Sequence, residues 1–188
     1  MTPGATVPDA ARLVAEMADA IESRGSVDLP HDEIVRHATE LARSNLRQWE
    51  LEDQTRDPRA PDSIVAEAKR AIDELNLSRH HLVEEIDAAI DRSVGQDPTA
   101  SLATESPGMV MDRLSVLVIR RARMAGGAAT DGQLAARLHL VETNLAALCS
   151  ALDALLQEVN SGRRRFLPYQ HLKLYADGRS RPASGSRA

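Results

Sequence analysis

Polar side chains occupy several positions of a predicted helix, residues 31–56, at which the heptad spacing calls for apolar ones. The stretch "NLRQWELEDQTRDP", residues 45–58, holds the only tryptophan of the chain. The residues expected on the inward face are Val35, Ala38, Ala42, Asn45, Trp49, Glu52 and Arg56. Burying a polar group costs free energy unless it is hydrogen-bonded or paired. This face therefore predicts either a polar cluster between helices or a binding site.

Two further predicted helices carry charged residues among apolar ones. In residues 62–93, Arg79 falls on the apolar face, beside a second row of polar residues: Lys69, Asp73, Asn76, His80 and Asp87. In the apolar stretch "VMDRLSVLVI", the neighbours Asp112 and Arg113 project about 100° apart, so they cannot pair well with each other. We therefore predict a cross-helix network drawn from Glu52, Asp53, Arg56, Lys69, Asp73, Arg79, Asp112 and Arg113.

The sequence leaves the role of this network open. The charges could reach solvent at a bundle end or fix the register of the helices. They could instead line a ligand pocket, or the pattern could reflect an error in the helical phase. In a pocket, the candidate general acids or bases are Asp53, Asp73 and Asp112. Arg56, Arg79 and Arg113 would then stabilise negative charge.

The segment "SGRRRFLPYQHLKLY", residues 161–175, combines arginines with aromatic residues. Phe166, Tyr169 and Tyr175 are three of the four aromatic residues of the chain, and they follow Arg163, Arg164 and Arg165. Arginines next to aromatic rings suit a phosphate and a stacked base or sugar. Two alternatives remain open. The aromatics could dock the segment on the bundle while the arginines balance a helix dipole, or the segment could bind a partner protein.

Other chemistries find little support. His80, His81, Glu84 and Glu85 form a cluster at helical spacing, but the Glu-x-x-His order of di-iron bundles is missing. Cys149 lies in an apolar setting that keeps a thiol inert. "AGGAATDG" lacks the G-K-[ST] of a phosphate loop. We therefore expect no metal ion and no cofactor.

Composition narrows the class of protein. The chain has 188 residues with 2% aromatics, enough for one domain with an aliphatic core. Its net charge of −5 argues against a nucleic-acid partner. The single cysteine, the missing signal peptide and the absence of a long apolar run favour a cytoplasmic protein without a membrane span. Abundant arginine and alanine fit a GC-rich bacterial genome.

Five helices are predicted, and no stretch alternates as a strand would. They cover about residues 8–23, 31–56, 62–93 with Asp62 as N-cap, a fourth from Pro107 that ends around "MAGGAATDG" and has Ser106 as N-cap, and 131–160. The last carries apolar heptad positions at Leu134, Leu138, Val141, Leu145, Leu148, Leu152, Leu155 and Val159. We predict an all-α fold, a mostly antiparallel bundle with long heptad-patterned helices in one domain, residues 1–177. Residues 178–188 should be a disordered, flexible tail.

Four motifs resemble the bacterial domain of unknown function 4254 (DUF4254) family over about Asn45 to Tyr175. They are W-x-x-E-D-x-x-R, K-x-x-I-D-x-L-N-x-x-R, T-E-x-P-G followed by D-R-L-S, and G-R-R-R-F-x-x-Y. The matching positions are Trp49, Glu52, Asp53, Arg56, Lys69, Asp73, Asn76, Arg79, Glu105, Gly108, Asp112, Arg113, Arg163, Arg164, Phe166 and Tyr169. The resemblance implies an all-helical bacterial protein, often encoded near glycosyltransferases of cell-envelope saccharide pathways. It implies no established activity. The GC-rich bias adds specialised-metabolite biosynthesis in an actinobacterium as an alternative setting.

Three functional hypotheses follow. The first, which we favour, is an accessory or ligand-binding protein of such a pathway that recognises an anionic, phosphorylated small molecule. The second is an enzyme acting on such a substrate. The third is a structural module that binds a glycosyltransferase or forms a homodimer. The predicted ligand-binding residues are Asn45, Trp49, Glu52, Arg56, Lys69, Asn76, Arg79, Arg113, Arg163, Arg164 and Tyr169.

Overall fold

The computed structural model describes residues 7–23 and 30–172. Within these residues the chain forms five helices: α1 (Ala10–Glu22), α2 (Glu33–Thr55), α3 (Asp62–Val94), α4 (Pro107–Ala125) and α5 (Gly132–Asn160). Two short strands, β1 (Ser101–Leu102) and β2 (Arg164–Arg165), complete the elements. The predicted all-α bundle is confirmed. The predicted tail, residues 178–188, lies outside the described residues.

Side chains cap the start of most helices. Asp32 Oδ1 accepts hydrogen bonds from the backbone N–H of Ile34 and Val35, and Ser106 caps α4 as predicted, with Pro107 in the first turn. The prediction that Asp62 caps α3 is wrong. Pro61 takes the N-cap position without a side-chain bond. Its backbone is extended, at φ −61° and ψ 144°, so Asp62 is already the first helical residue.

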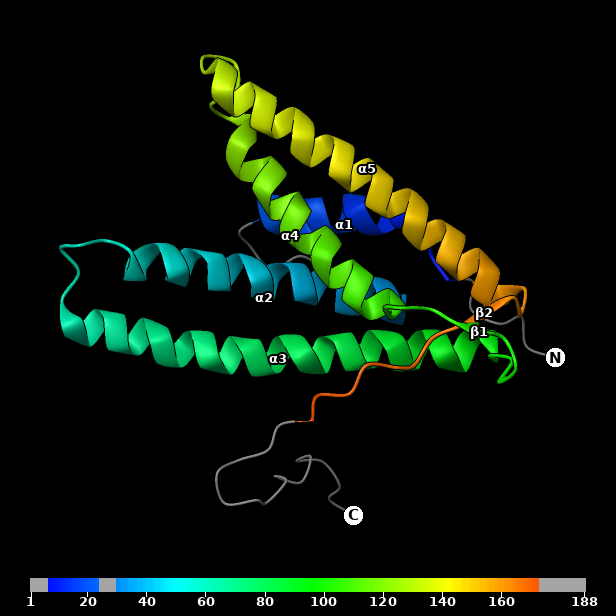
Figure 1. Ribbon diagram of the computed structural model, residues 1–188. Coiled ribbons are helices and arrows are strands. Elements are labelled where there is room, and N and C mark those ends of the chain that lie inside the picture. Colours follow the sequence, from blue (N-terminus) through cyan, green and yellow to red (C-terminus); the bar gives the residue numbers. More distant parts are fainter. Residues whose placement is uncertain (1–6, 24–29, 173–188) are drawn as a thin grey trace.

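The helices form two hairpins with α1 packed against both. α2 and α3 lie antiparallel, and the α4–α5 hairpin crosses them obliquely (Figure 1). α1 contacts α2, α4 and α5. Fully buried aliphatic side chains such as Leu13, Leu41, Ile86 and Leu114 fill the space between them, which is the aliphatic core expected from a sequence poor in aromatics.

One end of the α2–α3 hairpin extends beyond the other helices (Figure 1). A separate small cluster of Leu51, Ala68 and Ile72 holds the two helices together there. Because no third helix covers this end, the remaining faces of α2 and α3 stay in contact with water. Several residues that the sequence assigns to a site, among them Arg56 and Lys69, are therefore exposed to water.

α5 lies at the edge of the bundle and buries one side only. Val141, Leu145, Leu152 and Val159 are buried as the heptad pattern predicts, whereas the other predicted heptad residues, Leu134, Leu138, Leu148 and Leu155, are half-buried. α5 packs mainly on α4, so a narrow row of residues is enough to cover the contact. Among the described helices, none is both long and apolar enough to cross a membrane.

The two strands were not predicted from the sequence. β1 and β2 pair in parallel, with Ser101 opposite Arg164 and Leu102 opposite Arg165. Two residues are too few to show the alternation by which strands are recognised. The pair fixes the chain after α5, so that residues 166–172 run along α3 (Figure 1).

Candidate functional site

A buried polar cluster joins α2, α3 and α4. Asn45 Nδ2 donates to Asp112 Oδ1 at 2.9 Å and to Ser115 Oγ at 2.7 Å. Arg79 Nε donates to Asp112 Oδ1 at 2.8 Å, and Arg79 Nη2 pairs with Asp112 Oδ2. Ser115 Oγ in turn donates to the backbone carbonyl of Asp112 at 2.7 Å. One carboxylate therefore binds donors from two other helices.

The cluster explains why α2 turns a polar residue inward. Asn45, Asp112 and Ser115 are 6%, 9% and 0% exposed, so water cannot solvate them and they must satisfy one another. The hydrogen bond to Asp112 raises the pKa of the Arg79 guanidinium, against the effect of burial. The Arg79–Asp112 pair is thus a charged, bidentate contact of the kind that holds elements in a fixed register.

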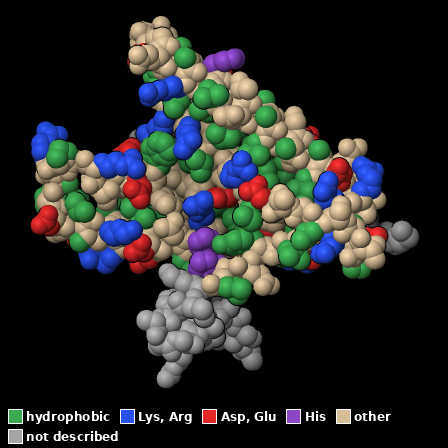
Figure 2. Space-filling view, viewed as in Figure 1, with side chains coloured by type: hydrophobic (Ala, Val, Ile, Leu, Met, Phe, Trp, Pro, Cys, Tyr) green, Lys and Arg blue, Asp and Glu red, His purple; other side chains and the backbone are tan. Residues whose placement is uncertain are grey.

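A groove of about 580 Å³ borders this cluster between α3, α4 and α5. Its lining residues are Arg79, Asp112, Arg113, Val116, Leu117, Arg120, Asn144, Ala147, Leu148 and Ala151. Basic and acidic side chains lie next to one another near the middle of this face, with histidines directly below them (Figure 2). The groove therefore combines an apolar floor with several fixed charges.

The arginines of the groove differ in how far they are neutralised. Arg79 uses Nε and Nη2 for Asp112, and among the described residues its Nη1 has no hydrogen-bond partner. Arg113 Nη1 binds Glu105 Oε2 at 2.7 Å on the surface. Arg120 is exposed and forms no ion pair with any residue that the structure describes. A positive charge is therefore left over in the groove.

Three aromatic and imidazole rings stack beside Arg79. The Tyr169 hydroxyl lies 2.8 Å from His80 Nδ1, and the rings of His80 and His171 stack with their centroids 4.0 Å apart. Burial and the neighbouring His171 lower the pKa of His80, and burial raises that of Tyr169. The contact therefore joins the C-terminal segment to α3 through a side chain as well.

Backbone hydrogen bonds hold the C-terminal segment, residues 166–172, on α3. The N–H of Tyr169 donates to Asp87 Oδ2 at 2.8 Å, and the N–H of His171 to Glu84 Oε1 at 2.6 Å. Asp87 Oδ1 also accepts the N–H of Gly108 at 2.7 Å, at the start of α4. Glycine is needed at 108, because an added Cβ would lie 2.7 Å from the backbone oxygen of Val83. Asp87 therefore links α3, α4 and the C-terminal segment.

Replacing Asp87 with asparagine is expected to change how stability depends on pH. Burial raises the pKa of Asp87, although hydrogen bonds from Ser106, Tyr169 and Gly108 oppose this. A raised folded pKa gives stability that is full below the unfolded pKa of about 4 and is lost as pH rises through the folded value. Urea unfolding from pH 4 to 7 should therefore show wild type gaining stability relative to Asp87→Asn on acidification. Parallel curves for the two proteins would contradict this assignment.

The structure divides the predicted site residues into separate groups. Asn45, Arg79 and Asp112 are in contact, and Arg113 and Tyr169 lie near them. Trp49 packs against the core, and Asn76 is half-buried without a side-chain hydrogen bond to any described residue. The remaining predicted residues lie elsewhere, so the predicted eight-residue network does not form as one unit.

Local ion pairs account for the residues outside the cluster. At the exposed end of the α2–α3 hairpin, Arg56, the residue directly after α2, pairs with Glu52 and Asp53 of that helix, and Lys69 pairs with Asp73 within α3. Each of these side chains is 41% or more exposed. Near β2, Arg164 pairs with Glu158, and Arg163 is exposed.

Sequence reasoning did not assign Arg120, Asn144 and His171 to the site. His80 and Asp87 belong to the row of polar residues beside the apolar face of residues 62–93. This row is the sequence feature from which their place near the site could have been predicted. Arg120 and Asn144 give no such signal, because exposed polar residues on a helix are ordinary.

A second groove of about 580 Å³ lies between α1, α2 and α4. Its charged residues are partly paired, since Glu50 contacts both Arg47 and Arg123. Arg43 also lines this groove. The groove ends at Ser23, next to residues 24–29, which lie outside the described part of the chain. The groove beside Asp112 is therefore the better-defined site.

Comparison with known proteins gives one match. A family model described as "Protein of unknown function (DUF4254)" matches residues 35–167, which include Asn45, Arg79 and Asp112 but not Tyr169 or His171. No curated protein and no solved structure shows significant similarity to the chain. Because the family model covers more than two thirds of the sequence, this chain belongs to the DUF4254 family of proteins of unknown function.

Proposed function

We propose that this protein binds an anionic small molecule, with phosphate as the simplest anionic group, in the groove beside Asp112. The observation that carries the proposal is the surplus of positive charge. Arg79, Arg113 and Arg120 line the groove with Asp112 as the one carboxylate, and Asp112 is already compensated by Arg79 and Asn45. An arriving anion would meet Arg120 and the remaining Nη1 of Arg79. The apolar floor of Val116, Leu117 and Leu148 suits a sugar or base ring.

A binding role is favoured over acid–base catalysis. Both oxygens of Asp112 accept hydrogen bonds, which leaves the carboxylate poorly placed to take a proton from a substrate. The other candidate carboxylates, Asp53 and Asp73, are 58% and 65% exposed and paired on their own helices. Neither shares a site with a second catalytic group among the described residues.

The setting we propose is an accessory protein of bacterial biosynthesis, working in the cytoplasm of an actinobacterium. The resemblance of the motifs to proteins encoded near glycosyltransferases supports a saccharide pathway, and the arginine- and alanine-rich composition supports a specialised-metabolite pathway as the alternative. Saccharide pathways draw on sugars activated as phosphates. Nucleotide sugars and sugar phosphates are therefore the first ligands to test, and a glycosyltransferase is the first partner protein.

Arg120→Ala should weaken binding of such a ligand at least about tenfold, the scale of one charge-assisted hydrogen bond. Isothermal titration calorimetry with nucleoside diphosphates, nucleotide sugars and sugar phosphates measures this directly. Arg137→Ala is the matched control. Arg137 is also an exposed arginine without an ion pair in the described chain, and it lies on α5 outside the groove. Absence of any anion binding in wild type, or an equal loss in both variants, would reject the proposal.

A further inference from the structure

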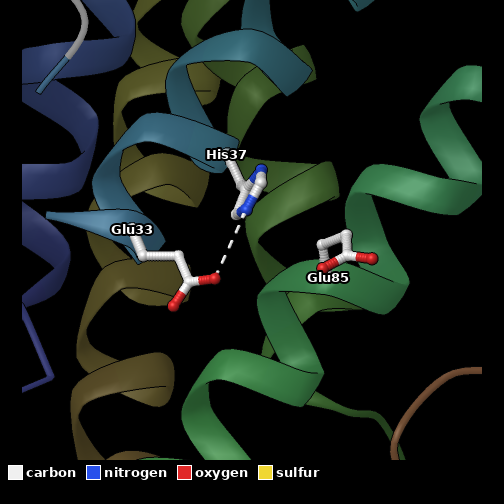
Figure 3. Close-up of side chains that lie close together, drawn as sticks. All are labelled: Glu33, His37 and Glu85. Atoms are coloured by element: carbon white, nitrogen blue, oxygen red, sulfur yellow. Dashed lines mark ion pairs between the residues drawn. The ribbon is translucent and has the colours of Figure 1, made fainter. Parts of the chain in front are cut away.

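Three side chains with metal-binding atoms converge where α2 and α3 face each other. Glu33 and His37 come from the first turns of α2, and Glu85 comes from α3 (Figure 3). One ligand atom from each lies within 4.8 Å of the others. The three residues belong to two helices that pack against each other. The distances between their Cα atoms are therefore fixed by helix packing and not by a loop.

His37 has the environment of a ligand. Its side chain is 14% exposed, and Nε2 lies 3.9 Å from Glu33 Oε1. Nδ1 lies 3.5 Å from Glu40 Oε2, yet it is buried and makes no hydrogen bond with any described residue. A buried ring nitrogen without a partner is costly. A metal at Nε2 would place the proton on Nδ1 and direct it to Glu40, the carboxylate–histidine–metal arrangement common in metal sites.

We propose that Glu33, His37 and Glu85 bind a divalent transition-metal ion, with Zn²⁺ as the best fit, and that this ion ties α2 to α3. One imidazole with two carboxylates favours Zn²⁺ over Mg²⁺ and Ca²⁺, which prefer oxygen ligands alone. Zn–N and Zn–O bonds of about 2.0–2.2 Å require the three atoms to draw together by about 1 Å. Glu33 is 48% exposed, so it is free to rotate, and water can supply the fourth ligand.

Two other side chains contact the same carboxylates. Arg92 Nη2 lies 3.1 Å from Glu33 Oε1, and His81 Nε2 lies 3.7 Å from Glu85 Oε1. Arg92 occupies one oxygen of Glu33, so a metal ion must take the other oxygen or displace the guanidinium. Removing Arg92 should therefore strengthen metal binding, whereas removing an ordinary surface arginine should not.

This site is separate from the arginine groove. His37 precedes Asn45 by about two helical turns, and Glu33, His37 and Glu85 do not line the groove. The sequence predicts no metal ion, because the local cluster of His80, His81, Glu84 and Glu85 lacks the spacing of a di-iron site. A set split between two distant stretches of sequence has no local motif to reveal it.

The test uses the full chain without an affinity tag, stripped with a chelator and titrated with Zn²⁺ by calorimetry and thermal unfolding. Zn²⁺ should raise the melting temperature of wild type. His37→Ala should weaken binding by more than the about 10- to 100-fold typical of losing an outer-shell partner. Glu85→Gln, which keeps the side-chain shape, should also weaken it and guards against a folding defect in His37→Ala.

The matched control is His81→Ala. His81 also lies beside two glutamates, at 3.8 Å and 3.7 Å, but it is 67% exposed and on a single helix with them. This variant should bind Zn²⁺ at least as tightly as wild type does, because it loses only a contact that occupies Glu85, and Arg92→Ala should bind it more tightly. The proposal is overturned if wild type shows no saturable Zn²⁺ binding, or if His81→Ala loses binding while His37→Ala and Glu85→Gln keep it. Anion binding in the groove should not depend on any of these changes.

Discussion

Arg79→Ala is expected to lower the free energy of unfolding by about 3 kcal/mol, the scale for breaking one partner out of a buried charged pair. The change removes both contacts of the guanidinium with Asp112 and leaves a carboxylate that is 9% exposed. Asn45 then remains as the one side-chain donor to this carboxylate among the described residues, and it carries no charge. We place the value at the lower end of the range because the Arg79 side chain is 33% exposed, so water would reach part of the space. Urea denaturation measures the loss.

Arg113→Ala supplies the comparison. Arg113 is the sequence neighbour of Asp112, but its side chain is 57% exposed and its partner Glu105 is 36% exposed. Exposed pairs contribute about 0–1 kcal/mol, so this variant should remain close to wild type. Adding Asp112→Asn to Arg79→Ala should recover part of the loss, because no charge is then left buried without its partner. Equal destabilisation by the two arginine variants would show that the Arg79–Asp112 pair has no special role.

Leu152→Asp should prevent folding altogether. Leu152 is 0% exposed in the contact of α5 with the rest of the bundle, and an aspartate there would be a buried charge without a partner. Lost packing alone costs about 2–5 kcal/mol. Together with the cost of burying an unpaired charge, it should exceed the free energy of unfolding, which is about 5–15 kcal/mol for a typical domain. Circular dichroism and size-exclusion chromatography detect the unfolded chain.

Leu140→Asp on the same helix should leave the fold intact, because Leu140 is 61% exposed. A helical, monodisperse Leu152→Asp protein would mean that α5 is not placed as described. Precipitation of Leu140→Asp with the same loss of helix would equally contradict the one-sided burial of α5.

The fold could be predicted because each signal for it is local. The heptad spacing of residues 131–160, the Ser106–Pro107 start of α4 and the prolines after α2 all act within a few residues along the chain. The polar cluster was predicted in part, since Asn45, Arg79 and Asp112 interrupt apolar faces and must find partners.

The extent of the cluster could not be predicted, for a physical reason. Helical periodicity tells which face of a helix turns inward, but not how far along its length another helix covers it. Glu52, Arg56, Lys69 and Asp73 are close in sequence to the separate cluster of Leu51, Ala68 and Ile72, which holds the projecting end of the α2–α3 hairpin together. They stay in water and pair with neighbours on their own helices.

The C-terminal segment is attached to α3 through main-chain amides, and this determines which residues are free to vary. Asp87 and Glu84 bind the N–H groups of residues 169 and 171, which every amino acid except proline provides. Pro168 falls between the bonded amides of Phe166 and Tyr169, where no N–H is required. Constraint on this attachment therefore falls on the acceptor carboxylates of α3 and on the buried ring of Phe166, while the exposed side chains of the segment, such as Leu167 and Leu172, can vary without detaching it.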